Sequence, residues 1–125
     1  MATVRSAERK QAKARGKQTE YACAKAMHGT VVGRSKAVKV GDTYVSINCQ
    51  RPPDVVAPGG FSFECKNTKF PKGVAAAAAQ AERNAPAAHD GIVWWFDADT
   101  GTTYIVMTKA VFLDRMGYQP EARDG

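Results

Sequence analysis

The chain has 125 residues, of which 44% are hydrophobic and 24% are charged, and its net charge is +6. This length and composition predict one globular domain and exclude both a disordered chain and two independent cores. Three cysteines without Cys-x-x-Cys spacing exclude a zinc site and a disulfide framework, and the apolar runs are too short to cross a membrane. We therefore expect a cytoplasmic protein with no membrane partner.

The N-terminal segment is the most basic part of the chain. Residues 1–17 carry six cations and the single anion Glu8, while the remainder is nearly balanced. A basic segment ahead of a balanced domain is typical of a contact with nucleic-acid phosphates, and a solubilising tail has the same composition. We expect residues 1–16 to form a mobile arm or to extend the following helix, with Gly16 as an interruption. The six cations are Arg5, Arg9, Lys10, Lys13, Arg15 and Lys17.

A helix is predicted over residues 17–27. Glu20, Ala24 and Met27 recur on one face at the i, i+4 and i+7 spacing. Because that face is otherwise small and apolar, Glu20 is directed inward or toward a cleft. A glutamate in the first turn also favours the helix dipole, and from the residues alone this second interpretation is the stronger.

Short strands and turns follow this helix. Residues 30–33 form a weak strand. The alternating stretches 38–40 and 43–47, separated by Gly41 and Asp42, predict a β-hairpin. Asp42 is therefore interpreted as a turn residue and not as a metal ligand.

The central prediction concerns residues 53–66, which are expected to form two strands joined by a tight turn. The turn is Pro-Gly-Gly at residues 58–60, because proline fixes its own φ and glycine adopts positive φ. In the second strand, alternate residues face opposite ways. One face carries Phe61, Phe63 and Cys65, which can enter a core, and the other carries Ser62, Glu64 and Lys66.

Two carboxylates are expected to meet where these strands pair. Asp54 begins the first strand, and pairing across the turn brings it near Glu64, with Lys66 beside it. Asp and Glu oxygens are the hard ligands that Mg²⁺ prefers. The arrangement therefore predicts a divalent-metal site, and a surface turn with an exposed ion pair is the alternative interpretation.

The rest of the chain alternates loop, helix and strand. An alanine-rich helix is predicted over residues 74–84, and its Gln80 points either into the cleft or into solvent. The remaining elements are a basic loop at 67–73, strands at 92–96 and 102–107, and a helix at 109–116. The fold class is α/β of mixed α+β type, with a central mixed β-sheet flanked by helices.

The two tryptophans are adjacent in the strand predicted at residues 92–96. Adjacent strand residues face opposite ways, so Trp94 and Trp95 are expected to serve the core and an interface and not to act as platforms for nucleobases.

Pro53 and Asp54, followed after nine residues by Glu64-x-Lys66, resemble the motif of the PD-(D/E)XK nuclease superfamily. Each half of this motif is weak alone, and the hairpin spacing and face alternation strengthen the match. The resemblance implies a restriction-endonuclease-like core. The chain would then consist of three parts: a basic arm at residues 1–16, a nuclease domain at 17–117 and a loose tail at 118–125.

Within that superfamily, the chain resembles archaeal-type Holliday junction resolvases, including those of phages. Residues 14–20, Ala-Arg-Gly-Lys-Gln-Thr-Glu, match the opening of those enzymes, and Gly33-Arg34-Ser35 is a looser match to their Arg/Ser loop. The resemblance implies a homodimer that cuts branched DNA during recombination or repair, in a bacterial, archaeal or phage-infected cell. We expect its interface around Trp94, Trp95 or Phe112.

The resemblance also implies roles for individual residues. Asp54, Glu64 and Glu20 would bind Mg²⁺ or Mn²⁺, and Lys66 would act on the attacking water, with Gln80 as an accessory residue. Because of this match, we prefer the interpretation of Glu20 as a site residue to its interpretation as an acid that only stabilises the start of a helix. The implied DNA contacts are the six cations of the arm together with Arg34, Ser35, Lys36, Lys69 and Lys72.

Two other functions fit the same residues. One is a nuclease of the same fold that acts on flaps, nicks or DNA ends. The other is a non-catalytic DNA-binding module, although binding alone has no use for carboxylates that face a polyanion.

Overall fold

The computed structural model describes residues 4–117, with side chains from residue 9 onward except that of Ala12, so the predicted tail at 118–125 lies outside it. The helices are α1 (Val4–Met27), α2 (Val74–Arg83) and α3 (Lys109–Met116). The strands are β1 (Thr30–Val31), β2 (Ala37–Val40), β3 (Thr43–Ser46), β4 (Val55–Ala57), β5 (Phe61–Lys66), β6 (Asp90–Asp97) and β7 (Thr102–Val106).

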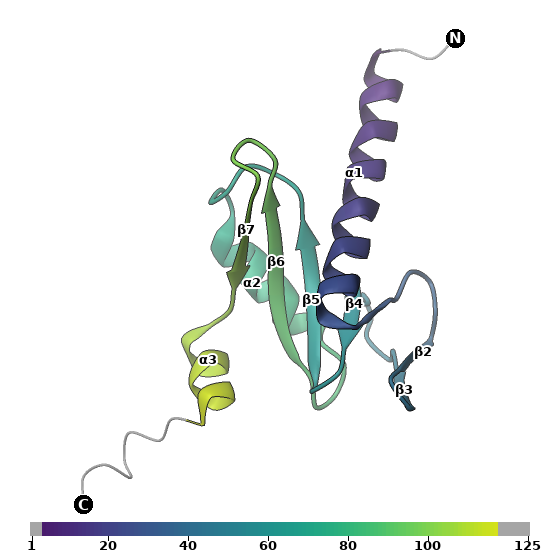
Figure 1. Cartoon of the computed structure of the whole chain (residues 1–125), viewed down its shortest axis with the longest axis vertical. Coiled ribbons are helices and arrows are strands. Elements are labelled where there is room, and N and C mark those ends of the chain that lie inside the picture. Colours follow the sequence, from purple (N-terminus) through teal and green to yellow (C-terminus); the bar gives the residue numbers. More distant parts are fainter. Residues whose placement is uncertain (1–3, 118–125) are drawn as a thin grey trace, which may run out of the picture.

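One mixed sheet organises these elements (Figure 1). Its five strands follow the order β1-β4-β5-β6-β7, and β2 and β3 form a separate hairpin. β5 and β6 pair in parallel, and the other neighbours in the sheet are antiparallel. With helices packed on both faces of the sheet, this is the α/β architecture that the sequence predicts.

Helix α1 begins much earlier than the predicted helix at 17–27. It continues through Gly16, so the predicted interruption at that residue is wrong. A single glycine costs a helix only about 1 kcal/mol relative to alanine, and the flanking Ala, Arg, Lys and Gln residues are strong helix formers. The arm therefore extends the helix, and α1 runs past the end of the sheet (Figure 1).

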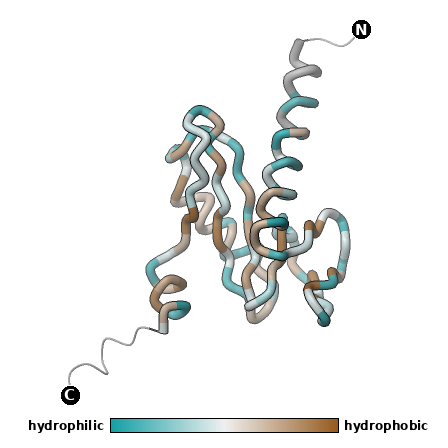
Figure 2. Tube along the Cα trace, in the orientation of Figure 1, coloured by the Kyte–Doolittle hydropathy of each residue, from teal (hydrophilic) through white to brown (hydrophobic). Residues whose placement is uncertain are grey.

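Each face of the sheet has its own hydrophobic cluster. On one face Cys23 and Ala24 of α1 pack near Phe63 of β5. On the other face Ala77 and Ala81 of α2 pack with β6. Hydrophobic residues gather on the central strands, while hydrophilic residues recur along α1 and the loops (Figure 2). No helix within residues 4–117 combines the length and the apolar character that a membrane crossing requires.

The adjacent tryptophans face opposite sides of the sheet, as predicted. Trp95 joins the α2 cluster with 2% of its surface exposed, which is the core position expected for one of the two tryptophans. Trp94 is half-buried on the α1 face. Phe112 is 49% exposed on α3.

Helix α2 approaches strand β6 most closely at Gly91. A Cβ atom on Gly91 would lie 1.9 Å from the carbonyl oxygen of Ala81. Real atoms cannot approach so closely, so any side chain here would push α2 away from the sheet. The absence of a side chain at Gly91 thus sets the distance between the helix and the strands.

Candidate active site

Asp54 and Glu64 lie close together at the pairing of β4 with β5. The antiparallel register runs from Val55–Phe63 to Ala57–Phe61, and Asp54 lies just before the first of these pairs, next to the backbone of residues 63–65. The Asp54 N–H donates to the Phe63 carbonyl at 3.0 Å, and the Cys65 N–H donates to Asp54 Oδ2 at 2.8 Å. The two carboxyl groups lie close enough for each to affect the pKa of the other.

The turn that creates this pairing has the predicted form. Gly59 and Gly60 adopt φ angles of 86° and 79°, a region that favours glycine. Arg115 of α3 donates to the carbonyls of both glycines at 2.6 and 2.7 Å, and it also pairs with Asp90. The register of the carboxylates is therefore fixed both by the turn and by a residue far away in the sequence.

Glu64 is a buried acid, with 5% of its surface exposed. Burial is the main reason why its pKa rises to about 7, and the charge of Asp54 adds to the rise. A hydrogen bond from Asn84 Nδ2 to Glu64 Oε1, 2.7 Å long, opposes it. Burial also raises the pKa of Asp54, against the stabilising effects of the Cys65 N–H and the Lys66 charge. Without a cation, the pair thus retains protons more readily than exposed acids do.

The raised pKa of Glu64 has a consequence for stability. An acid whose pKa rises on folding binds more protons in the folded state, so the unfolding free energy falls as pH rises from about 4.5 to about 7. In chelator, we expect Glu64→Gln to remove much of this slope and to add up to ~2–3 kcal/mol of unfolding free energy at pH 8. Thermal unfolding across this pH range measures it.

The control for this measurement is Glu82→Gln, because Glu82 is an exposed acid on α2. That variant should keep the wild-type slope. If Glu64→Gln keeps the slope as well, Glu64 does not titrate as its burial indicates.

Lys66 lies next to Glu64 on the same face of β5, and it is held by helix α2. Its Nζ donates to Gln80 Oε1 at 3.0 Å. Gln80 therefore points into the site and not into solvent, which resolves the two interpretations of this residue. Lys66 and Gln80 also line a cavity of about 280 Å³, together with Lys72.

Glu20 lies on α1 at the edge of this arrangement. Burial is the main cause of its raised pKa, the charge of Asp54 raises it further, and Lys17 lowers it. However, no group of three or more His, Cys, Asp or Glu side chains within residues 9–117 is arranged to hold a metal ion. The predicted ligand set of Asp54, Glu64 and Glu20 is thus not assembled as a unit.

The two acids still have the chemistry that a hard cation requires. Mg²⁺ is usually bound through one or two carboxylates, and water and substrate phosphate complete its octahedron. Asp54 and Glu64 provide two such groups, and burial raises the pKa of each acid.

The predicted DNA contacts are exposed at the surface. Along α1 this holds for Arg9, Lys10, Lys13, Arg15 and Lys17, and the Arg5 side chain lies outside the described residues. Arg34, Ser35 and Lys36 are exposed in a loop that begins beside Asp54, where the Val32 N–H donates to the Asp54 carbonyl at 3.0 Å. Lys69 and Lys72 are exposed in the loop after β5. Among the described side chains the only ion pair joins Arg115 and Asp90, so these cations remain available to an external anion.

Asn84 was not predicted as a site residue. It is the C-cap residue of α2 and is 6% exposed. The only signal in the sequence is a polar residue one turn after Gln80, on the same side of the predicted helix. Its partner Glu64 lies twenty residues earlier, and their contact depends on how α2 packs on the sheet.

Comparisons with protein-family models, with curated proteins and with solved structures find no match to this chain.

Proposed function

We propose that this chain is a divalent-metal-dependent DNA endonuclease of the PD-(D/E)XK type, and more narrowly a Holliday junction resolvase. The observation that carries the proposal is the closeness of the Asp54 carboxylate, held by the Cys65 N–H, to Glu64, with Lys66 next on the same face of β5. A buried acid and a half-buried acid beside a lysine are costly for stability, and a catalytic role would account for this cost.

In this proposal, each side chain has a distinct task. Asp54 and Glu64 would hold Mg²⁺ or Mn²⁺, which supplies charge neutralisation at the scissile phosphate and an activated water. Asn84 would orient Glu64 through its 2.7 Å hydrogen bond. Gln80 would hold the Lys66 ammonium toward the attacking water and the developing negative charge. Glu20 would accept a hydrogen bond from water bound to the metal.

The exposed cations support DNA as the substrate. Residues 9–17 of helix α1 carry five exposed Lys and Arg side chains, the helix reaches beyond the sheet, and a basic loop begins beside Asp54. Such surfaces bind phosphates by releasing counterions. Coordinated nicks on a four-way junction need two sites related by a two-fold axis, so this activity would require a homodimer.

A cleavage assay on a set of DNA substrates tests the proposal. We expect paired, symmetric nicks in a mobile four-way junction with Mg²⁺ or Mn²⁺. In Ca²⁺ we expect binding with little turnover, and in excess chelator no cleavage. The matched substrates are linear duplex, nicked duplex, a 5′ flap and single strands of the same sequence.

Each other outcome selects a different function. Full cleavage in chelator would contradict a metal mechanism. Cutting that requires free termini or flaps would identify an end-processing nuclease, and tight binding without cutting in any of these metals would identify a DNA-binding module.

A further inference from the structure

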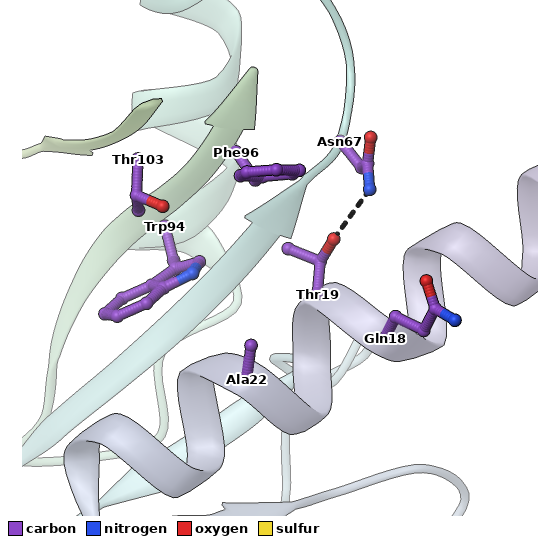
Figure 3. A pocket seen from close by; sticks show the side chains of 7 residues that line it. All are labelled: Gln18, Thr19, Ala22, Asn67, Trp94, Phe96 and Thr103. Atoms are coloured by element: carbon purple, nitrogen blue, oxygen red, sulfur yellow. Dashed lines mark hydrogen bonds between the residues drawn. The ribbon is translucent and has the colours of Figure 1, made fainter. Parts of the chain in front are cut away.

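A pocket of about 300 Å³ lies between α1 and the sheet, on the face opposite α2. Trp94 and Phe96 of β6 form its aromatic wall, and Thr19 and Ala22 of α1 face them across the gap (Figure 3). Its volume is at the lower end of the range for small-molecule sites, ~300–1,000 Å³. The pocket is therefore large enough for one flat ring system.

The walls of this pocket are held in place. The Trp94 ring packs edge-on against Phe63, with centroids 6.1 Å apart and an interplanar angle of 88°. Asn67 donates from Nδ2 to Thr19 Oγ1 at 2.8 Å and to the Arg15 carbonyl at 3.3 Å. These bonds leave Asn67 Oδ1 as an acceptor and Trp94 Nε1–H as a donor, neither with a partner among the described residues.

We propose that this pocket receives a single unpaired nucleobase of the DNA substrate, which gives Trp94 the role of a nucleobase platform that the sequence alone argued against. This inference rests on the proposed function and narrows its substrate to DNA with an unpaired or displaced base near the cut. Every nucleobase has a π-face that stacks on aromatic side chains, and its edge carries both donors and acceptors. The Trp94 and Phe96 rings offer the first kind of contact, and the polar residues that line the pocket, Gln18, Asn67 and Thr103, offer the second.

The position of the pocket links it to the candidate active site. Lys66 and Asn67 are consecutive at the end of β5, where Lys66 contacts α2 and Asn67 contacts α1. A DNA strand that crosses the end of β5 can therefore place a phosphate at Lys66 and the neighbouring base against Trp94. A paired base in a duplex can reach the pocket only if it first unstacks from its neighbours.

Charge favours DNA over a second copy of the chain in this pocket. The exposed Arg15 and Lys17 lie on α1 within one turn of Thr19. They attract a phosphate backbone. Outside residues 1–17 the chain is nearly balanced in charge, so the surface of a second copy would not offer these cations a comparable attraction.

Binding assays in chelator, where no cleavage occurs, test the inference. The probes are a matched duplex, the same duplex with one unpaired base, and a four-way junction, each measured by fluorescence anisotropy with the full chain. Trp94→Leu should weaken binding of the single-base bulge by ~5- to ~150-fold, and binding of the matched duplex by less than ~2-fold. Trp94→Phe, which keeps an aromatic face, should retain most of the preference for the bulge.

A second variant avoids any loss of core packing. Ala22 is exposed, so Ala22→Leu should fold normally and fill the pocket, with the same selective loss as Trp94→Leu. Ala110→Leu, at an exposed position on α3, is the matched control and should bind every probe like the wild type.

Tryptophan fluorescence gives an independent readout. Trp95 is buried on the other face, so quenching by the bulged duplex should come from Trp94 and vanish in Trp94→Phe. Bulge binding unchanged in folded Ala22→Leu would overturn the base pocket while leaving the nuclease proposal intact. A dimer that dissociates in Ala22→Leu would assign the pocket to a second copy. If the wild type bound none of the probes, the proposed function would fail together with the inference.

Discussion

Replacing Asp54 by Asn or Glu64 by Gln is expected to lower junction cleavage by at least ~10³-fold, since each change removes a metal ligand worth several kcal/mol in the transition state. DNA binding should stay equal or tighten, because each change also removes a negative charge that faces a polyanion. Lys66→Ala should lose cleavage to a similar extent and bind slightly less well. Gel assays on a four-way junction, with circular dichroism to confirm folding, measure both properties.

Two conservative changes serve as controls for these variants. Asp42→Asn alters an exposed turn carboxylate of the β2–β3 hairpin, and Glu82→Gln alters an exposed acid on α2. Both should cut at wild-type rates. Glu20→Gln distinguishes the two interpretations of that residue, because only a role near the metal predicts a loss of cleavage. If folded Asp54→Asn and Glu64→Gln variants cut normally, the active site lies elsewhere.

The second large effect is expected from Gly91→Ala, a change of one methyl group. The new Cβ would lie 1.9 Å from the Ala81 carbonyl oxygen, so α2 must move away from β6. Overpacking of this kind lowers the unfolding free energy by about 1–3 kcal/mol or more. Because α2 carries Gln80 and Asn84, the same shift should loosen both hydrogen bonds to the site and reduce cleavage in the fraction that remains folded.

The matched control is Gly16→Ala on α1. A Cβ at Gly16 meets no atom within 4 Å, and alanine is the better helix former, so this variant should gain about 0.5–1 kcal/mol of unfolding free energy. Thermal unfolding of both variants gives the comparison. A Gly91→Ala protein as stable as the wild type would mean that α2 moves freely on the sheet.

The hairpin could be predicted from the sequence because its determinants are local. The turn at residues 58–60 fixes the register, and alternation fixes the faces, so the closeness of Asp54 and Glu64 follows from residues ten positions apart. The cap of α3 is local for the same reason: Thr108 directly precedes the helix, and its Oγ1 accepts from the Val111 N–H at 3.3 Å.

Features that depend on tertiary packing could not be predicted. The contact between Asn84 and Glu64 requires α2 to lie at the distance that Gly91 permits. The burial of Trp95 depends on which face of the sheet α2 covers, and alternation alone does not say which tryptophan is on that face. The prediction at Gly16 failed differently, since a single unfavourable residue was weighed above a long run of helix formers.

Among the described residues, the side-chain hydrogen bonds of Asp54, Glu64 and Lys66 all fall within one continuous stretch, residues 54–84. One contiguous segment, residues 54–84, thus contains these side chains and their partners. A rearrangement of the gene can move this segment without separating them. A circular permutant opened in the exposed turn at residues 98–101 keeps residues 54–84 in one piece. One opened between Asn67 and Gly73 separates Lys66 from Gln80, so new termini are better tolerated beyond β6 than after β5.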